Sequence, residues 1–154
     1  KFTSKNPFRI KITGRTKHFI NAFGEELIVD NAEAALKKAC ERTGAEIREY
    51  TASPIYMTDE RNGGHQWLIE FTKMPDNLEH FMEILDTTLK SVNSDYEAKR
   101  YKNISLAFPI VEIARENLFY DWLKERGRLG GQNKVPRLAN NREFMDRLLE
   151  LNKR

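Results

Sequence analysis

Two short runs of this 154-residue chain combine glycine with basic and amide side chains, which are residue types that bind phosphates and carboxylates. Residues 14–27 read Gly-Arg-Thr-Lys-His-Phe-Ile-Asn-Ala-Phe-Gly-Glu-Glu-Leu, and residues 130–137 read Gly-Gly-Gln-Asn-Lys-Val-Pro-Arg. The second run places Lys134 in a glycine-bearing loop, where a compact ammonium group can meet an anionic oxygen at close approach. On spacing alone, a solvated loop between two helices is the simpler explanation. We nevertheless predict that the two runs contribute to one active site.

Metal binding and nucleophilic catalysis find little support in the remaining reactive side chains. His18, His65 and His80 lie in three different expected elements, and none has a Cys or Asp at the spacing of a metal ligand. We therefore predict no metal site, and expect His65 to anchor a turn next to Gly63 and Gly64. The single cysteine, Cys40, lies in a helical run without an activating base, so a catalytic thiol is not expected.

A nucleic-acid interface is a further alternative, because aromatic and basic residues alternate near the N-terminus. These residues are Phe8, Arg9, Lys11, Arg15, Lys17, Phe19 and Phe23. Aromatic rings among basic side chains can stack on the bases of a single strand. A strand pair with apolar residues inward and basic residues in water explains the same alternation more simply, and 26 Lys and Arg against 23 Asp and Glu leave a net charge of only +3.

The composition predicts an ordered globular domain in a reducing, cytoplasmic setting. Hydrophobic residues make up 40% of the chain, which is enough for a continuous core, and one cysteine cannot form an internal disulfide. No apolar run reaches the roughly 20 residues that span a bilayer. The chain starts without methionine, directly in an amphipathic segment, so we expect a fragment of a longer polypeptide.

Periodicity in the first half predicts strands and one helix. Alternating residues around 8–12 and 17–20 predict a strand pair, with a hairpin turn or a hinge at 14–16. Asp30 and Glu33 form a capping-box pattern for a helix to about residue 42, ended by Gly44. Its packed face would comprise Ala32, Ala35, Leu36, Ala39 and Cys40. Residues 45–57 and 65–72 then predict a β-hairpin, in which Pro54 indicates an edge strand or a bulge.

The second half continues with helices and one more strand. Asp76 and Glu79 predict the start of a helix that reaches about residue 93, followed by a polar connection to residue 103. The apolar run 104–113 predicts a strand buried on both faces. A short helix around residues 118–123 ends before Gly127, and Asn140 or Asn141 caps a last helix. That last helix would carry Phe144, Leu148, Leu149 and Leu151 inward.

Together these elements predict an α+β domain spanning residues 1–154. It would contain a small mixed or antiparallel sheet with a ferredoxin-like order of elements, covered by about four helices and preceded by an N-terminal hinge strand pair near residues 14–18.

Several segments resemble the adenylate-forming enzyme superfamily. Residues 14–17, 19–20 and 24–27, followed by Glu33, are similar to its hinge segment. The whole chain resembles the C-terminal domain of the auxin-responsive (Gretchen Hagen family) acyl acid amido synthetases, especially bacterial members. This resemblance rests on four ordered segments: residues 19–27, 64–67, 95–100 and 132–137.

The resemblance implies an enzyme that uses ATP and Mg²⁺ to convert a carboxylic acid to an acyl adenylate. It then transfers the acyl group to an amine, commonly that of an amino acid. In this family a small C-terminal domain swings over a large N-terminal domain between the two half-reactions. By the resemblance, the N-terminal domain is this chain's partner and supplies most of the ATP site, so the fragment alone should be inactive.

The resemblance also implies roles for four residues. Arg15 would lie near the ribose hydroxyls, Lys17 would be the hinge, and Gly24 would let its loop approach the acceptor channel. Lys134 would be the mobile basic residue that enters the site for adenylation. The superfamily's glycine before that lysine is Asn133 here, as it is tyrosine in the plant enzymes. The other class that the residues leave open is a non-catalytic α+β binding or interaction module.

Overall fold

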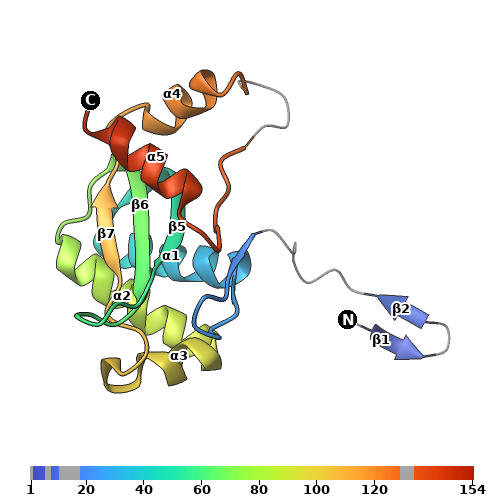
Figure 1. Cartoon of the computed structure of the whole chain (residues 1–154). Helices are drawn as coiled ribbons and strands as arrows, with labels where there is room; N and C mark the ends of the chain where they lie inside the picture. Colours follow the sequence, from blue (N-terminus) through green and yellow to red (C-terminus); the bar gives the residue numbers. More distant parts are fainter. Residues whose placement is uncertain (1, 6–7, 11–17, 129–133) are drawn as a thin grey trace.

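The computed structural model describes residues 2–5, 8–10, 18–128 and 134–154, with side chains from residue 18 onward (Figure 1). Its strands are β1 (Phe2–Lys5), β2 (Phe8–Ile10), β3 (Phe19–Ile20), β4 (Leu27–Ile28), β5 (Glu46–Ile55), β6 (Gly64–Lys73) and β7 (Ile110–Ile113). Its helices are α1 (Val29–Thr43), α2 (Leu78–Val92), α3 (Ser94–Arg100), the 3₁₀ turn η1 (Tyr101–Asn103), α4 (Leu118–Glu125) and α5 (Glu143–Asn152).

The main sheet has three strands in the order β5-β6-β7. Strands β5 and β6 form the predicted antiparallel hairpin, and β7 pairs parallel to β6. Two small antiparallel pairs, β1 with β2 and β3 with β4, accompany this sheet. The α+β class and the mixed sheet are therefore confirmed.

The central strand β6 is buried on both faces because helices cover each side of the sheet (Figure 1). Trp67 and Ile69 pack with α1, α2 and α3 in the larger core, and Phe71 lies partly buried at the margin of that core. These three residues form the apolar face of β6 toward the larger core. Leu68 points to the other side, where it packs with α4 and α5 in a second core.

Helix α1 has the predicted packed face, since Ala32, Ala35, Leu36 and Ala39 are buried and Cys40 is half-buried. Gly44 ends the helix with φ 72°, a left-handed conformation that glycine adopts without strain. The predicted start is wrong, because the helix begins at Val29 instead of after Asp30. Asn31 Oδ1 accepts a hydrogen bond from the Ile28 N–H at 3.2 Å there.

The start of α2 is displaced from the prediction by one residue. Asn77, and not Asp76, is the N-cap, and its Oδ1 accepts from the His80 N–H at 3.1 Å. The predicted end at Asn93 is confirmed.

The polar connection predicted for residues 93–103 is wrong. The Asn93 side chain accepts from the Tyr96 N–H at 2.9 Å and starts α3. Tyr96 and Arg100 are buried beneath this helix, which makes five α-helices in the described chain instead of about four.

Residues 104–113 do not form one strand buried on both faces. Only Ile110–Ile113 is a strand, and it is an edge strand whose Ile110 and Ile113 are each 42% exposed. Pro109 lacks an N–H for a ladder, so the strand begins after it. Leu106 leaves the sheet and is buried in the larger core instead.

The N-terminal strand pair also differs from the prediction. Phe8–Ile10 is a strand, but its partner is Phe2–Lys5, and β3 pairs with β4 instead of with β2. The turn predicted at residues 14–16 lies outside the described residues.

The two C-terminal helices match their predictions closely. Helix α4 buries Leu118, Phe119 and Trp122 and ends before Gly127. The N-cap of α5 is Arg142 instead of Asn140 or Asn141, and the Asn141 side chain just before it accepts from the Glu143 N–H at 3.0 Å. Of the residues predicted to face inward, Leu148 and Leu151 are buried, and Phe144 and Leu149 are half-buried. The second core also contains Met145, which was not among the predicted residues.

Candidate functional site

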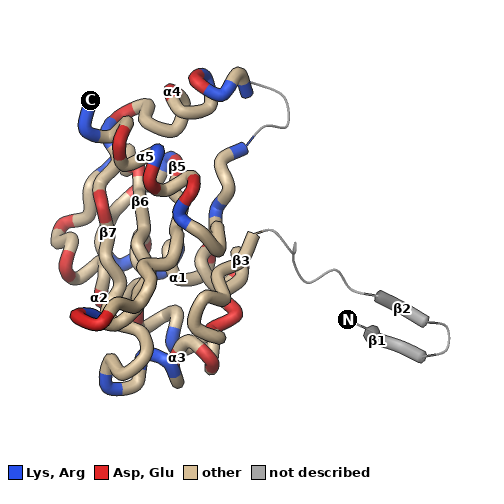
Figure 2. Tube along the Cα trace, viewed as in Figure 1, with Lys and Arg blue, Asp and Glu red and all other residues tan. Residues whose placement is uncertain are grey.

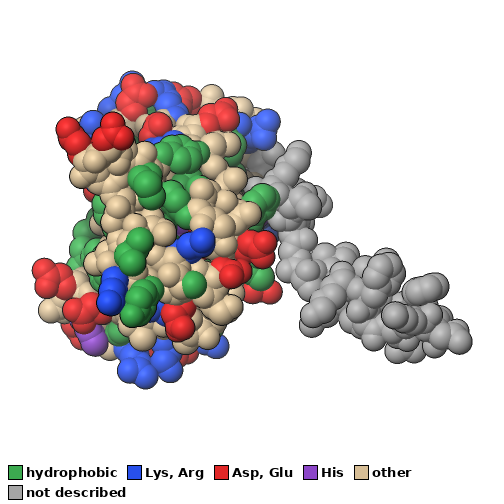
Figure 3. Space-filling view, turned by 60° about the horizontal axis from the view of Figure 1, so that its bottom comes forward, with side chains coloured by type: hydrophobic (Ala, Val, Ile, Leu, Met, Phe, Trp, Pro, Cys, Tyr) green, Lys and Arg blue, Asp and Glu red, His purple; other side chains and the backbone are tan. Residues whose placement is uncertain are grey.

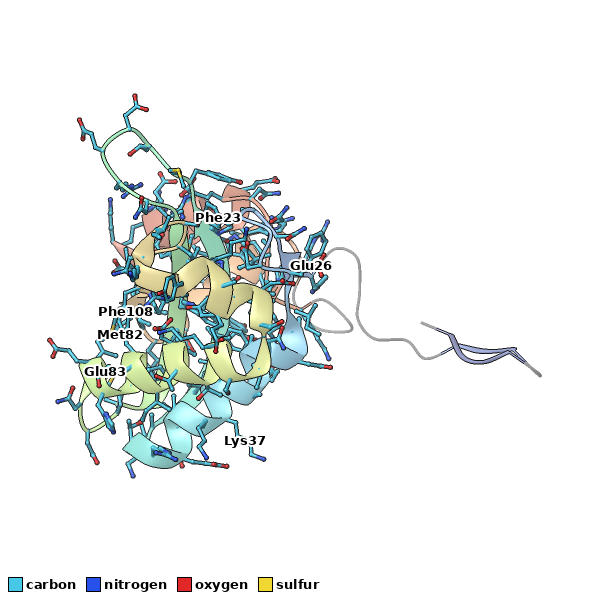
Figure 4. All side chains as sticks on the ribbon, turned by 90° about the horizontal axis from the view of Figure 1, so that it is seen from below. Phe23, Glu26, Lys37, Met82, Glu83 and Phe108 are labelled. Atoms are coloured by element: carbon cyan, nitrogen blue, oxygen red, sulfur yellow. The ribbon has the colours of Figure 1, made fainter. Side chains whose placement is uncertain are left out.

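The first glycine-bearing run forms a tight loop, residues 21–26, between β3 and β4. Gly24 has φ 84°, which side-chain-bearing residues rarely adopt. A Cβ at Gly24 would also lie 3.4 Å from Lys99 Cε, so the loop passes close to α3. The Asn21 side chain closes the loop by accepting from the Glu26 N–H at 3.1 Å. Figure 4 views the molecule from below, with Phe23 and Glu26 marking this loop.

A buried carboxylate holds the loop to the sheet. Glu25 is fully buried, and its Oε1 lies 2.9 Å from Nε2 of His65, which is only 1% exposed. Its Oε2 accepts from the Phe23 N–H at 2.8 Å. The predicted anchoring role thus exists at His65, although the anchored turn is the β3–β4 loop and not the turn beside Gly63.

Two further contacts fix the loop from other elements. Asn93 Nδ2 donates to the carbonyl oxygen of Glu25 at 2.9 Å. The Phe23 ring lies over Gly63, where a Cβ would stand 2.2 Å from a ring carbon. Only glycine fits at position 63 without moving that ring.

Beneath the loop, a buried ionic network joins α2 to α3. Arg100 donates to Asp86 through Nε and Nη2, both at 2.8 Å, and the Tyr96 hydroxyl donates to Asp86 at 2.6 Å. Burial opposes ionisation of Asp86, but the hydrogen bonds from Arg100 and Tyr96 outweigh it and lower the pKa of its carboxyl. Burial and the Asp86 charge raise the pKa of Tyr96.

The second run leads into a segment held along the free edge of β5. Ala52 donates its N–H to the Arg137 carbonyl at 3.0 Å, and its own carbonyl accepts from the Ala139 N–H at 3.1 Å. Thr51 Oγ1 also donates to the Pro136 carbonyl at 2.7 Å. Lys134 begins this segment with an exposed side chain, while Val135 beside it is 3% exposed.

Arg137 reinforces the attachment of this segment. Its guanidinium lies 3.1 Å from Glu49 and 5.0 Å from the centroid of the Tyr50 ring. Burial raises the pKa of Glu49, and Arg137 offsets part of that rise. Burial also raises the pKa of Tyr50, whose hydroxyl donates to Glu33 at 2.7 Å.

One hydrogen bond links the loop of the first run to the segment that follows the second run. The Asn21 N–H donates to Asn140 Oδ1 at 2.8 Å, which joins the start of the loop to the end of the β5-bound segment. Gly24 borders Lys99, and Lys134 lies six residues before Asn140, a span of at most about 20 Å when extended. The structure therefore links the first run to a residue beyond the second run, and no contact among the described residues joins Gly24 to Lys134. Arg15 and Lys17 lie outside the described residues.

The described residues offer no set of three His, Cys, Asp or Glu side chains that could hold a metal ion. Nor does any helix in the described part of the chain have the length and apolarity to cross a membrane. The face in Figure 3 mixes acidic, basic and apolar side chains, so its described part shows no uniform basic patch for phosphates. Figure 2 shows acidic and basic residues interspersed along the described trace in the same way.

A family model for the GH3 family C-terminal domain matches residues 30–143. The chain belongs to this family. The match spans α1 to the start of α5 and includes His65, the ionic network and Lys134. The resemblance seen in the sequence is thereby confirmed.

Solved structures of acyl acid amido synthetases share the fold of this GH3 domain. The GH3.15 acyl acid amido synthetase superposes with a TM-score of 0.70 at 18% identity, over 90% of this chain and 27% of that one. The AtGH3.15 acyl acid amido synthetase in complex with 2,4-DB gives 0.69 at 15% identity, over 91% and 26%. The chain thus spans about a quarter of the length of these relatives. A search of curated proteins gave no match.

Proposed function

We propose that this GH3 domain is the mobile C-terminal domain, residues 1–154, of a cytoplasmic ATP-dependent acyl acid amido synthetase. The family match and the shared fold support the enzyme class. The observation that supports a catalytic role most directly is the placement of Lys134. It is exposed at the start of a segment that backbone hydrogen bonds fasten to β5.

The reaction has two steps. First, a carboxylate oxygen of the acid attacks the α-phosphorus of ATP, and the bond to the β-phosphate breaks to release pyrophosphate. Then the nitrogen of an amine, such as that of an amino acid, attacks the acyl carbon. The bond from that carbon to AMP breaks, AMP leaves with the electron pair, and the amine releases a proton to solvent.

Lys134 would act in the first step. Its ammonium group would balance negative charge on the carboxylate and the α-phosphate as it builds in the transition state. Losing one such electrostatic contact typically slows a reaction by about 10²- to 10³-fold. Because the segment after Lys134 is bound to β5, the backbone from which this side chain extends is held in place while the long side chain itself stays flexible. This combination suits a group that meets its substrate only after the domain closes.

The other proposed residues serve binding and motion. Arg15 would lie at the ribose of the nucleotide, Lys17 would be the hinge, and Gly24 would line the acceptor channel. Mg²⁺ accompanies ATP in this proposal. Because the described residues offer no cluster of three metal-ligating side chains, the metal would be held by the N-terminal partner domain and the phosphates.

The test is ATP–pyrophosphate exchange in the enzyme that contains this domain and its N-terminal partner. Lys134→Ala should reduce the exchange rate by about 10²- to 10³-fold. Lys153→Ala, at the exposed end of α5, is the matched control and should leave the rate within about twofold of the unmodified enzyme. Unchanged exchange in Lys134→Ala would remove the role of this lysine, and exchange by the 154-residue chain alone would contradict the division of labour between the domains.

A further inference from the structure

We propose that Glu25 and His65 are positioning residues that hold the 21–26 loop in the one conformation that serves amide formation. This inference rests on the proposed function, in which Gly24 faces the acceptor amine. Neither residue would touch the substrate, since Glu25 is fully buried and His65 is 1% exposed. They would act through the backbone of the loop.

The carboxylate of Glu25 uses its two oxygens for two different tasks. Oε2 accepts from the Phe23 N–H at 2.8 Å and so fixes the turn within the loop. Oε1 binds Nε2 of His65 at 2.9 Å and so fixes the loop to β6, 40 residues away in the sequence. Gly24 lies between Phe23 and Glu25, so both tasks constrain its position.

His65 has one polar contact that can orient its ring. Its Nδ1 has no hydrogen-bond partner among the described residues, so the bond to Glu25 is the polar contact of the imidazole. The rings of Tyr96 and Phe23 flank it, with centroids 5.7 Å and 6.4 Å away. The imidazole thus lies between aromatic rings, and its Nε2 atom points toward Glu25 of the loop.

Stability alone does not account for this pair. Removing a carboxylate and an imidazole from water is costly, and a well-packed apolar pair of the same volume is often as stabilising. The surrounding core is already apolar and contains Tyr96, with Phe23 packed against it. What an apolar pair could not supply is a directed bond to the Phe23 N–H, and this bond defines the shape of the loop.

A second constraint acts on the loop at Gly63, two residues before His65. Because a Cβ at Gly63 would lie 2.2 Å from a Phe23 ring carbon, Gly63→Ala must displace that ring. This change leaves both members of the Glu25–His65 pair in place. It therefore offers an independent way to move the loop.

The two half-reactions provide the readout. In amide formation the acceptor nitrogen must reach the acyl carbon as the bond to AMP breaks, and a displacement of about 1 Å can cost on the order of 10²-fold in rate. Adenylation would depend on Lys134, and the segment that follows this lysine is bound to β5 through the hydrogen bonds of Ala52 with Arg137 and Ala139. Loosening the loop should thus slow the second step and spare the first.

The experiment uses the complete enzyme with Glu25→Gln, His65→Leu and Gly63→Ala. Each variant should lower the single-turnover rate of aminolysis of a supplied acyl adenylate by about 10- to 100-fold, with pyrophosphate exchange within about twofold of the unmodified enzyme. Hydrogen exchange measured by mass spectrometry should accelerate in residues 21–26. His65→Gln, which can still donate a hydrogen bond to Glu25, should recover part of the aminolysis rate.

Asn152→Ala is the control for a general loss of stability. It removes hydrogen bonds to Arg115 and Ile113 on the other face of the sheet, and both half-reactions should stay within about twofold. Equal slowing of both half-reactions in Glu25→Gln and His65→Leu, unchanged hydrogen exchange in the loop, or the same split in Asn152→Ala would each overturn the proposal. An unmodified enzyme that performs neither step would overturn the proposed function and, with it, the catalytic part of this inference. The hydrogen-exchange result would still decide whether the pair holds the loop.

Discussion

Replacing Arg100 with methionine should lower the free energy of unfolding of the 154-residue chain by about 3–5 kcal/mol. The change leaves Asp86, which is 3% exposed, buried without its bidentate partner, and breaking a buried pair on one side typically costs this much. Arg100 also donates to the Leu106 carbonyl at 3.1 Å, so a backbone acceptor loses its partner as well. A domain of ordinary stability has about 5–15 kcal/mol in total, so this loss is a large fraction.

The structure predicts a graded series around the same carboxylate. Tyr96→Phe removes one hydrogen bond to Asp86 and leaves Arg100 in place, so about 1.5–3 kcal/mol should be lost. Lys90→Ala removes an ion pair with Asp86 in which the lysine is 37% exposed, and about 0.5 kcal/mol should be lost.

Urea unfolding followed by circular dichroism would measure the series, with equal slopes required for a two-state comparison. In thermal scans, each kcal/mol should lower Tm by about 2–4 °C in a chain of this length. The reasoning would be refuted if Arg100→Met unfolded within about 1 kcal/mol of the unmodified chain, or if Lys90→Ala cost as much as Arg100→Met.

Two further predictions concern backbone conformation and pH. Gly44→Ala should lower the free energy of unfolding by about 1 kcal/mol, because φ is 72° at this position. Gly64→Ala should be nearly neutral, because a Cβ there meets nothing within 4 Å and no positive φ is required. Comparing the urea midpoints of the two variants would test this difference. Because the folded-state pKa of Asp86 is lowered, its stabilising contribution should be complete above its unfolded pKa of about 3.9 and be lost as pH falls through the folded value. Unfolding curves between about pH 6 and 2 should show this loss, and Asp86→Asn should remove it from the profile.

The elements predicted correctly are those whose signals are local. Helices α1 and α2 show their apolar faces at three- and four-residue spacing, and the β5–β6 hairpin shows strand-forming residues on both sides of a glycine-rich turn. Such patterns depend on neighbours within one or two turns of the chain, so the sequence alone displays them. The exact caps were missed because several Asn and Asp residues lie within reach of each helix start, as Asp76 and Asn77 show.

The elements predicted wrongly depend on contacts between distant residues. Helix α3 has a polar sequence, and its buried Arg100 becomes compatible with the core only through Asp86 on α2. The apolar run 104–113 predicts a fully buried strand, but the place of Ile110–Ile113 at the sheet edge follows from the parallel pairing with β6. Neither pairing leaves a periodic signal in the sequence.

The candidate site likewise contains residues that local motifs point to and residues that depend on contacts between distant parts of the chain. Gly24 and Lys134 stay predictions, made because their motifs resemble those of a known family. The Glu25–His65 pair was missed, since 40 residues separate its members, although Glu25 after Gly24 and His65 after two glycines were both visible as polar residues next to turns. The sequence marked each residue but could not show that they bind each other.

The fold holds the two glycine-bearing runs by different means, and this difference fits the two half-reactions that we propose. Gly24 has no side chain with which to adjust to a substrate, so the backbone of the 21–26 loop must be fixed in advance, and the bonds of Glu25 fix it. Lys134 has four rotatable side-chain bonds, so only its attachment needs to be fixed, and the hydrogen bonds of Ala52 fasten the segment that follows it. The hydrogen bond between Asn21 and Asn140 ties the loop to the segment that follows Lys134, so a rotation of the domain would move both together. A domain rotation that moves Lys134 out of the active site would thus bring the 21–26 loop into it. If the two segments moved independently, the two movements would no longer be linked.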